Sequence, residues 1–255
     1  MTSLSNLPDS LPILTSGLGN AEKGKACAMS AVDWMEGGKG NSDMPECVHP
    51  VLRQAFIVVN DANIWVDDDH RTRTLWPLIA RAMGTAPTGT YREQRELAIR
   101  LAIFNTKYVL PLVAAKQKSE YLKTTEVVQA WCDGEASGKQ CELQRGFLVA
   151  SIMSDLNGRL GDDVISAAFS LITAISNYKG FLVDTMFTVN TFVGVNAFYA
   201  FSAVLAQQIS PSSTLDPVKF LIDLLDEYDR LTNRAPTAEL DLRGLDNLVP
   251  VVSTL

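Results

Sequence analysis

Two apolar stretches with helical spacing, joined by a polar turn, lie between residues 27 and 61 and constrain the fold most strongly. In the first stretch, apolar side chains recur at steps of three and four residues, namely Cys27, Ala28, Ala31, Val32 and Met35. This spacing places them on one face of a helix. Gly37 and Gly38 end that face, and residues 41–45 form a turn before a proline. The helical spacing then resumes at Val51, Leu52, Ala55, Phe56 and Val59. The sequence therefore predicts a helical hairpin.

Similar spacing along the rest of the chain predicts an all-α fold, a multi-helix globular bundle built from helical hairpins. Further helices are expected near residues 67–82, 91–113, 116–131, 143–156 and 162–176. Asp216 followed by Pro217 marks the start of another helix, because a capping side chain precedes proline at the first helical position. We expect a flexible lead at residues 1–20, a single helical domain at 21–234 and an irregular tail at 235–255. If the domain divides, the loop near 133–140 is the expected boundary.

Composition limits the classes of function. The chain has 255 residues, 47% of them hydrophobic, and a net charge of −7. This charge disfavours general binding to nucleic acid or anionic lipid. Four cysteines, two of them in apolar helical surroundings, fit a reducing cytoplasm better than a disulfide framework. The first thirteen residues lack the pattern of a signal peptide. We therefore expect a cytoplasmic protein, in the host cytoplasm if a phage encodes it.

The most apolar segment spans residues 181–206 and is long enough for a bilayer span. Asp184, Asn190 and Asn196 interrupt it, and basic clusters do not flank it. A buried core helix or an oligomer-interface helix is the favoured interpretation, with a strand as the competing assignment because Phe, Val and Thr are frequent. We expect a homo-oligomer without a membrane anchor.

The hairpin also resembles an uncharacterised family of actinobacterial and phage proteins. The resemblance rests on Cys27-Ala28-Met29-Ser30-Ala31, on the run from Ser42 to Pro50 (SDMPECVHP), and on Asn60-Asp61. It continues through residues 69–73 and 78–85, and covers roughly residues 17–112. Ser30 stands where the family usually carries glutamate. The resemblance implies a phage or actinobacterial context and brings no activity with it.

Polar turns at helix ends, together with nearby arginines, form the candidate ligand-binding site. Its residues are Ser42, Asp43, Asn60, Asp61, Arg71, Arg73 and Arg81. The guanidinium group suits an anionic, nucleotide-like ligand because it donates two parallel hydrogen bonds. The alternative interpretation, which we favour for these residues, is an intramolecular network of salt bridges and helix caps that fixes the hairpin.

Three features of the sequence bear on catalysis or metal binding. Residues 19–26 (GNAEKGKA) resemble a phosphate-binding loop, but Ala26 replaces the hydroxyl that would bind magnesium. His70 beside Asp67, Asp68 and Asp69 could bind a metal, but helix capping is the favoured explanation of these aspartates. Cys27 lies on an apolar stripe, which favours a buried, inert thiol. We therefore predict no catalytic residue, no metal site and no cofactor.

The leading functional hypothesis is a non-enzymatic, self-associating helical binding protein. Its more specific version is a phage accessory or anti-defence factor that sequesters a nucleotide-type small molecule. One alternative is a structural or protein-interaction protein without a small ligand. Another is a metal-assisted hydrolase that uses residues 67–70.

Overall fold

The computed structural model describes residues 11–109, 115–154 and 216–235, and the chain forms two compact units. The first unit combines Met1–Pro87 with Ile209–Leu255, and the second spans Thr88–Gln208. The chain therefore leaves the first unit after Pro87 and returns to it at Ile209. This division differs from the boundary considered near 133–140, since the short loop before Gly138 joins two helices within the second unit.

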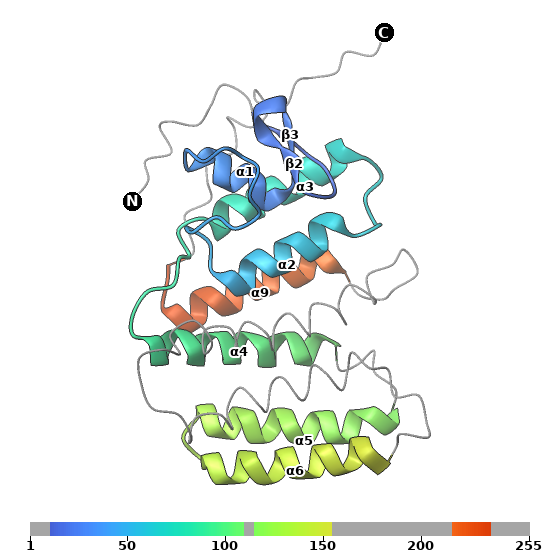
Figure 1. Cartoon of the computed structure of the whole chain (residues 1–255), viewed down its shortest axis with the longest axis vertical. Helices are drawn as coiled ribbons and strands as arrows, with labels where there is room; N and C mark the ends of the chain where they lie inside the picture. The colour runs from blue at the N-terminus through green and yellow to red at the C-terminus, as the bar shows by residue number, and fades with distance from the viewer. Residues whose placement is uncertain (1–10, 110–114, 155–215, 236–255) are drawn as a thin grey trace. The chain divides into compact units, whose positions relative to one another are not determined.

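Four helices build most of the described part of the first unit: α1 (Ala28–Met35), α2 (Pro50–Asp61), α3 (Asp68–Ala82) and α9 (Pro217–Thr232). The helices α1 and α2 contact each other, which confirms the predicted helical hairpin. Helix α9 lies alongside α2 and also contacts α3, although it is distant from both in the sequence (Figure 1). The C-terminal helix thus completes a bundle that the N-terminal segment begins.

Helix boundaries in the first unit follow from capping residues. Helix α2 begins with Pro50 at its first position, and the side chain of His49 accepts a hydrogen bond from the N–H of Val51. Asp67 caps α3 by accepting from the N–H of His70, as the run of aspartates predicts. Asp216 caps α9 in the same way, and Pro217 follows it. The predicted helix starts at Asp67 and Asp216 are therefore confirmed.

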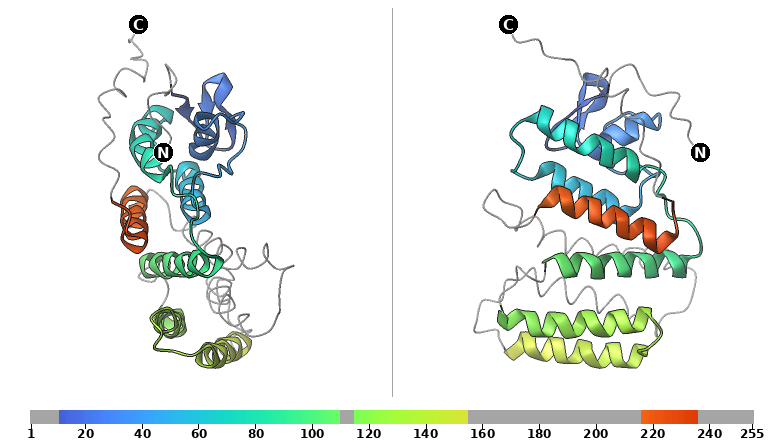
Figure 2. Two further views of the ribbon diagram at one scale, coloured as in Figure 1. Left: turned by 90° about the vertical axis from the view of Figure 1, so that its left-hand side faces the viewer. Right: turned by 180° about the vertical axis from the view of Figure 1, so that it is seen from behind.

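A small three-stranded sheet precedes α1. Its strands are β1 (Ile13–Leu14), β2 (Gly19–Asn20) and β3 (Lys25–Ala26), in the spatial order β1-β3-β2. Strand β3 pairs in parallel with β1 and antiparallel with β2, with Leu14 opposite Ala26 and Gly19 opposite Ala26. The sheet contacts α1 and α3 (Figure 2). Leu11, Pro12 and Leu14 are buried, so residues 11–20 of the expected flexible lead are part of the folded unit.

The core of the first unit lies among α1, α2, α3 and α9. Its largest fully buried side chains are Leu14, Met29, Leu52, Phe56, Leu75, Ile79 and Phe220. Helix α9 contributes a continuous apolar stripe whose buried members are Phe220, Leu221, Leu224, Leu225 and Tyr228. Their spacing of three and four residues places this stripe against α2 and α3.

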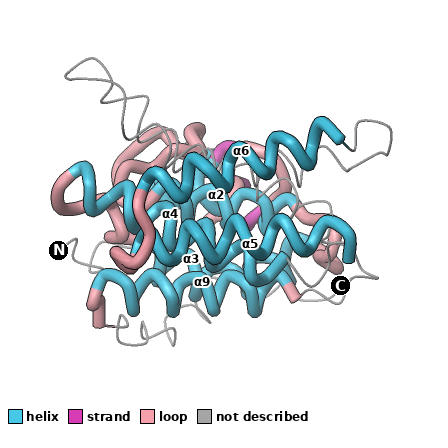
Figure 3. The backbone as a smooth tube through the Cα atoms, turned by 90° about the horizontal axis from the view of Figure 1, so that it is seen from below, coloured by secondary structure: helices cyan, strands magenta, loops and turns pink. Residues whose placement is uncertain are grey.

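The described part of the second unit consists of α4 (Tyr91–Val109), α5 (Ala115–Cys132) and α6 (Gly138–Ser154). Helices α5 and α6 contact each other along their lengths, and α4 contacts α5 (Figure 3). The buried side chains include Ile99, Leu101, Ile103, Val128 and Cys141. The helices expected at 91–113, 116–131 and 143–156 correspond to these three elements.

A mostly helical fold is therefore confirmed. The structure also contains a small sheet, which the sequence did not predict. None of the helices within residues 11–109, 115–154 and 216–235 is both long and apolar enough to cross a membrane. The helix expected at 162–176, the apolar segment 181–206 and all but the first residue of the tail at 235–255 lie outside the described residues.

Candidate functional site

Asn60 and Asp61, at the end of α2, connect the small sheet to α1. The buried amide of Asn60 donates to the carbonyl of Thr15 at 2.9 Å and accepts from the N–H of Ala28 at 3.3 Å. Asp61 accepts from the amide of Asn60 at 2.8 Å and from the N–H of Gly17 at 2.9 Å. The pair therefore fixes the turn after β1 and supplies an acceptor to the first turn of α1.

The same contacts show whether residues 19–26 could form a phosphate-binding loop. A phosphate needs free N–H groups at the start of a helix. At α1, Asn60 accepts from Ala28 and the sulfur of Cys27 accepts from the N–H of Ser30 at 3.3 Å. Residues 19–26 form two strands around a 3-10 turn (Ala21–Lys23) instead of a loop that opens directly into a helix. The segment is therefore built as a hairpin and not as a phosphate cradle.

Arg71 of α3 is buried and contacts strand β1. Its Nη1 atom donates to Asp68 at 2.6 Å and to the carbonyl of Leu14 at 3.4 Å. Lys25 forms a longer ion pair with the same aspartate, at 3.6 Å. Thr72 accepts from the N–H of Leu14 at 2.9 Å and donates to the carbonyl of Asp68 at 2.5 Å. Together these contacts attach β1 to the first turn of α3.

The remaining candidates from the hairpin lie elsewhere on the first unit. Arg73 is exposed and forms an ion pair with Asp69 on its own helix. Ser42 accepts a hydrogen bond from the N–H of Met44 in the loop between α1 and α2, and Asp43 lies in the same loop. The structure therefore brings Asn60 and Asp61 together, and it holds each of Arg71 and Arg73 against a carboxylate of α3.

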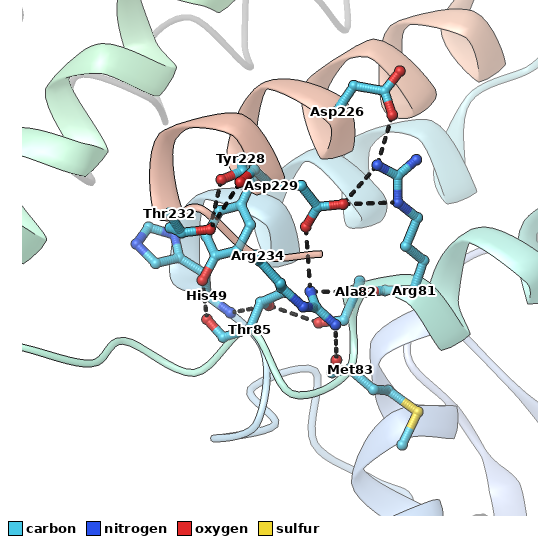
Figure 4. A network of polar contacts seen from close by, with 10 residues as sticks. All are labelled: His49, Arg81, Ala82, Met83, Thr85, Asp226, Tyr228, Asp229, Thr232 and Arg234. Carbon is cyan, nitrogen blue, oxygen red and sulfur yellow. Dashed lines mark hydrogen bonds and ion pairs between the residues drawn. The ribbon is translucent and has the colours of Figure 1, made fainter. Parts of the chain in front are cut away.

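Arg81, near the end of α3, joins that helix to α9. Its Nη2 atom lies 2.7 Å from Asp229 and 2.6 Å from Asp226, and its Nε atom lies 3.2 Å from Asp229 (Figure 4). Asp229 is only 5% exposed, and Arg234 approaches its second oxygen at 3.7 Å. Arg234 also donates to the carbonyls of Arg81 at 3.1 Å and Met83 at 3.1 Å, which caps the C-terminal end of α3.

A second contact joins α9 to the start of α2. His49 is 2% exposed, and the centroid of its ring lies 5.6 Å from that of Tyr228 (Figure 4). The Tyr228 hydroxyl donates to the carbonyl of Thr85 at 2.9 Å. The Thr85 hydroxyl accepts from the N–H of His49 at 3.0 Å and donates to the carbonyl of Ala82 at 2.6 Å. We call His49, Thr85 and Tyr228 the α9 joint.

Sequence reasoning missed the partners that α9 contributes. Asp229 follows Leu225 by four residues, so helical spacing already places its carboxylate at the edge of the apolar stripe of α9. A carboxylate in such a position needs a buried cationic partner. That signal indicates an ion pair, but it does not identify Arg81, which lies 148 residues away in the sequence.

The thiols of Cys47, Cys132 and Cys141 are poor nucleophiles. Burial, with a contribution from Glu36, raises the pKa of Cys47 to about 11. Burial raises the pKa of Cys132 to about 12 and that of Cys141 to about 11. At neutral pH these groups are almost entirely protonated, and only the thiolate reacts or binds metal readily. The described residues also include no group of three or more His, Cys, Asp or Glu side chains placed to hold a metal ion.

Helix α6 carries two large apolar side chains on its outer face. Leu143 is 61% exposed and Phe147, one turn later, is 57% exposed. Cys141 and Gln144 of the same helix are buried. We call Leu143 and Phe147, with Gly146 between them, the α6 face.

Comparisons with known proteins give no significant match to a family model, a curated protein or a solved structure.

Proposed function

We propose that this protein is a non-enzymatic, self-associating helical protein, and that the α6 face is its interface with a second copy. The observation that carries the proposal is the exposure of Leu143 and Phe147 on adjacent turns of one helix. Single exposed apolar residues are common on protein surfaces. A pair at this spacing instead forms a stripe of the kind that helices bury against one another.

Gly146 makes this stripe suitable for close contact between helices. A Cβ atom added to Gly146 would meet nothing within 4 Å, so the surface beside the glycine is open. A position without a side chain lets a second helix approach closely beside the two apolar side chains. In an antiparallel pairing around a two-fold axis, Leu143 of one copy would lie near Phe147 of the other. One patch then serves both partners, as a symmetric dimer requires.

The more specific version, in which a phage accessory factor sequesters a nucleotide-type molecule, receives less support from the contacts. An anion bound by Arg71, Arg73 or Arg81 would have to displace Asp68, Asp69 or the pair Asp226 and Asp229. The proposal therefore requires no small ligand. Native mass spectrometry determines whether a ligand is bound.

Native mass spectrometry and multi-angle light scattering of the full chain test the proposal. We expect an oligomer of the wild-type protein, and a shift toward monomer when Leu143 and Phe147 are both replaced by aspartate. Burial of one such side chain contributes about 1.5–3 kcal/mol, so losing even two contributions weakens association by at least roughly a hundredfold.

The matched control is Val66→Asp, because Val66 is 84% exposed and belongs to the first unit, whereas α6 belongs to the second. This variant makes the same chemical change and should leave the oligomer intact. A wild-type chain that is strictly monomeric, or a double variant that still assembles, would refute the proposal. An added mass of a few hundred daltons, retained by a wild-type oligomer, would favour the version with a ligand.

A further inference from the structure

The α9 joint depends on a histidine in its neutral form. His49 is the N-cap of α2, and its Nδ1 atom accepts a hydrogen bond from the N–H of Val51 at 3.2 Å. An imidazole nitrogen can accept a hydrogen bond only when it carries no proton. The neutral ring therefore holds its proton on Nε2. Protonation of Nδ1 would remove the cap and place two donors against each other.

The surroundings of His49 also oppose a positive charge. Arg53 lies one turn along the same helix, and the N-terminal end of α2 carries the positive end of the helix dipole. Tyr228 of α9 faces the ring, and burial raises the pKa of its phenol above the ordinary value, so it stays uncharged. The nearby carboxylate of Asp229 is already engaged by Arg81 and Arg234. The pKa of His49 is lowered to about 4, mainly by burial and to a smaller extent by the positive charge of Arg53.

Three segments distant in the sequence meet at His49. The N–H of His49 binds Thr85 after α3, the ring contacts Tyr228 of α9, and the Tyr228 hydroxyl binds Thr85 in turn. A change at His49 therefore reaches the start of α2, the segment after α3 and the last turns of α9 together. Helix α9 is also held by its apolar stripe and by the ion pairs of Arg81, so the joint is one of three attachments of this helix.

We propose that the α9 joint is an acid-triggered latch, in which protonation of His49 releases α9 from α2 and α3. Release exposes the apolar stripe of α9 and the faces of α2 and α3 that it covers. This inference does not depend on the α6 face, since the two features lie in different units.

Hydrogen exchange, followed by mass spectrometry on the full chain, tests the latch. His49→Asn is the matched variant, because asparagine caps helices well and does not titrate in this range. Wild-type and variant proteins are compared at the same pH, which cancels the intrinsic pH dependence of exchange. If the released state has an ordinary histidine pKa of 6.5, opening increases about thirtyfold at about pH 5. We therefore expect α9 of the wild type to exchange about thirtyfold faster than α9 of the variant, after normalisation at neutral pH.

Two results would overturn the latch. One is equal exchange of α9 in both proteins at acidic pH. The other is a uniform loss of protection across α1, α2 and α9, since that result indicates global unfolding. If the variant does not fold, an NMR titration of the wild-type protein still decides the matter, because the chain has only two histidines. A His49 signal that titrates near its ordinary value in the folded protein excludes the mechanism, whereas one that titrates near 4 and moves together with α9 amide signals supports it.

Discussion

Asp229 is the residue whose replacement tests most directly how α9 is attached. Its carboxylate is 5% exposed and lies between two guanidinium groups, those of Arg81 and Arg234. Asparagine has nearly the same shape but no charge, and its NH₂ group cannot accept a hydrogen bond from either arginine. Asp229→Asn therefore leaves two partly buried cations without their shared counterion.

We expect Asp229→Asn to lower the free energy of unfolding by about 3 kcal/mol. Removing one partner of a buried ion pair usually costs about 3–5 kcal/mol, and the lower end applies because Arg81 keeps Asp226 as a partner. Asp226→Asn is the matched control, since it removes a carboxylate from the same Nη2 atom. The Asp226 side chain is 60% exposed, and exposed ion pairs contribute about 0–1 kcal/mol.

Urea unfolding followed by tryptophan fluorescence measures the difference. Three of the four tryptophans, Trp34, Trp65 and Trp76, belong to the first unit, so a Trp131→Phe background makes the signal specific to that unit. With a urea dependence of about 2 kcal/mol per molar, the midpoint should fall by about 1.5 M for Asp229→Asn and by less than about 0.5 M for Asp226→Asn. Equal shifts for the two variants would refute the reasoning, because burial would then not govern the strength of these ion pairs.

Other perturbations test other parts of the first unit and the thiols. Because the pKa of His49 is lowered from 6.5 to about 4 on folding, its contribution to stability is complete above pH 6.5 and declines as the pH falls toward 4. The total loss is about 3 kcal/mol, measurable by urea unfolding at a series of pH values, and His49→Asn should not show this component. Gly19→Ala should destabilise the sheet more than Gly17→Ala in thermal melts. Both glycines have positive φ, but only at Gly19 would a Cβ atom lie 2.7 Å from the Cα of Ala26. Cys47 in the native protein should react with iodoacetamide at mildly alkaline pH about a hundredfold more slowly than in the unfolded chain, because its pKa is about 11 rather than 9.0. Peptide mapping quantifies that reaction, and equal rates in both states would contradict the assigned burial.

Local spacing predicted the helices well because each depends on residues close in the sequence. The stripes at 27–35 and 51–59 became α1 and α2, and the caps Asp67 and Asp216 begin α3 and α9 as expected. The sheet was missed for the opposite reason. Its strands have two residues each, and they are held by contacts such as Leu14 to Thr72, 58 residues apart. Strands this short carry no readable alternation, so only the packed structure defines them.

For the candidate site, too, the sequence predicts features that depend on neighbouring residues and misses contacts between distant ones. The sequence identified the residue types and the turns, and the alternative of a salt-bridge and cap network matches the contacts of Asn60, Asp61, Arg71 and Arg73. A ligand-binding role for these residues stays a prediction. The sequence groups Arg81 with Arg71 and Arg73 as arginines near the polar turns, whereas the contacts of Arg81 are with α9. Proximity in sequence could not distinguish the two ends of α3.

The return of the chain at α9 explains why the first unit cannot be understood from its N-terminal segment alone. Phe220, Leu221, Leu224 and Leu225 are fully buried, and each such side chain contributes about 1.5–3 kcal/mol. This gross burial contribution, about 6–12 kcal/mol in total, is similar in size to the net stability of a typical domain, about 5–15 kcal/mol. Without α9, the faces of α2 and α3 would be exposed, and Arg81 would lose both of its carboxylates. The N-terminal hairpin is therefore only one part of a folding unit. The other part, α9, is synthesised after residues 88–208.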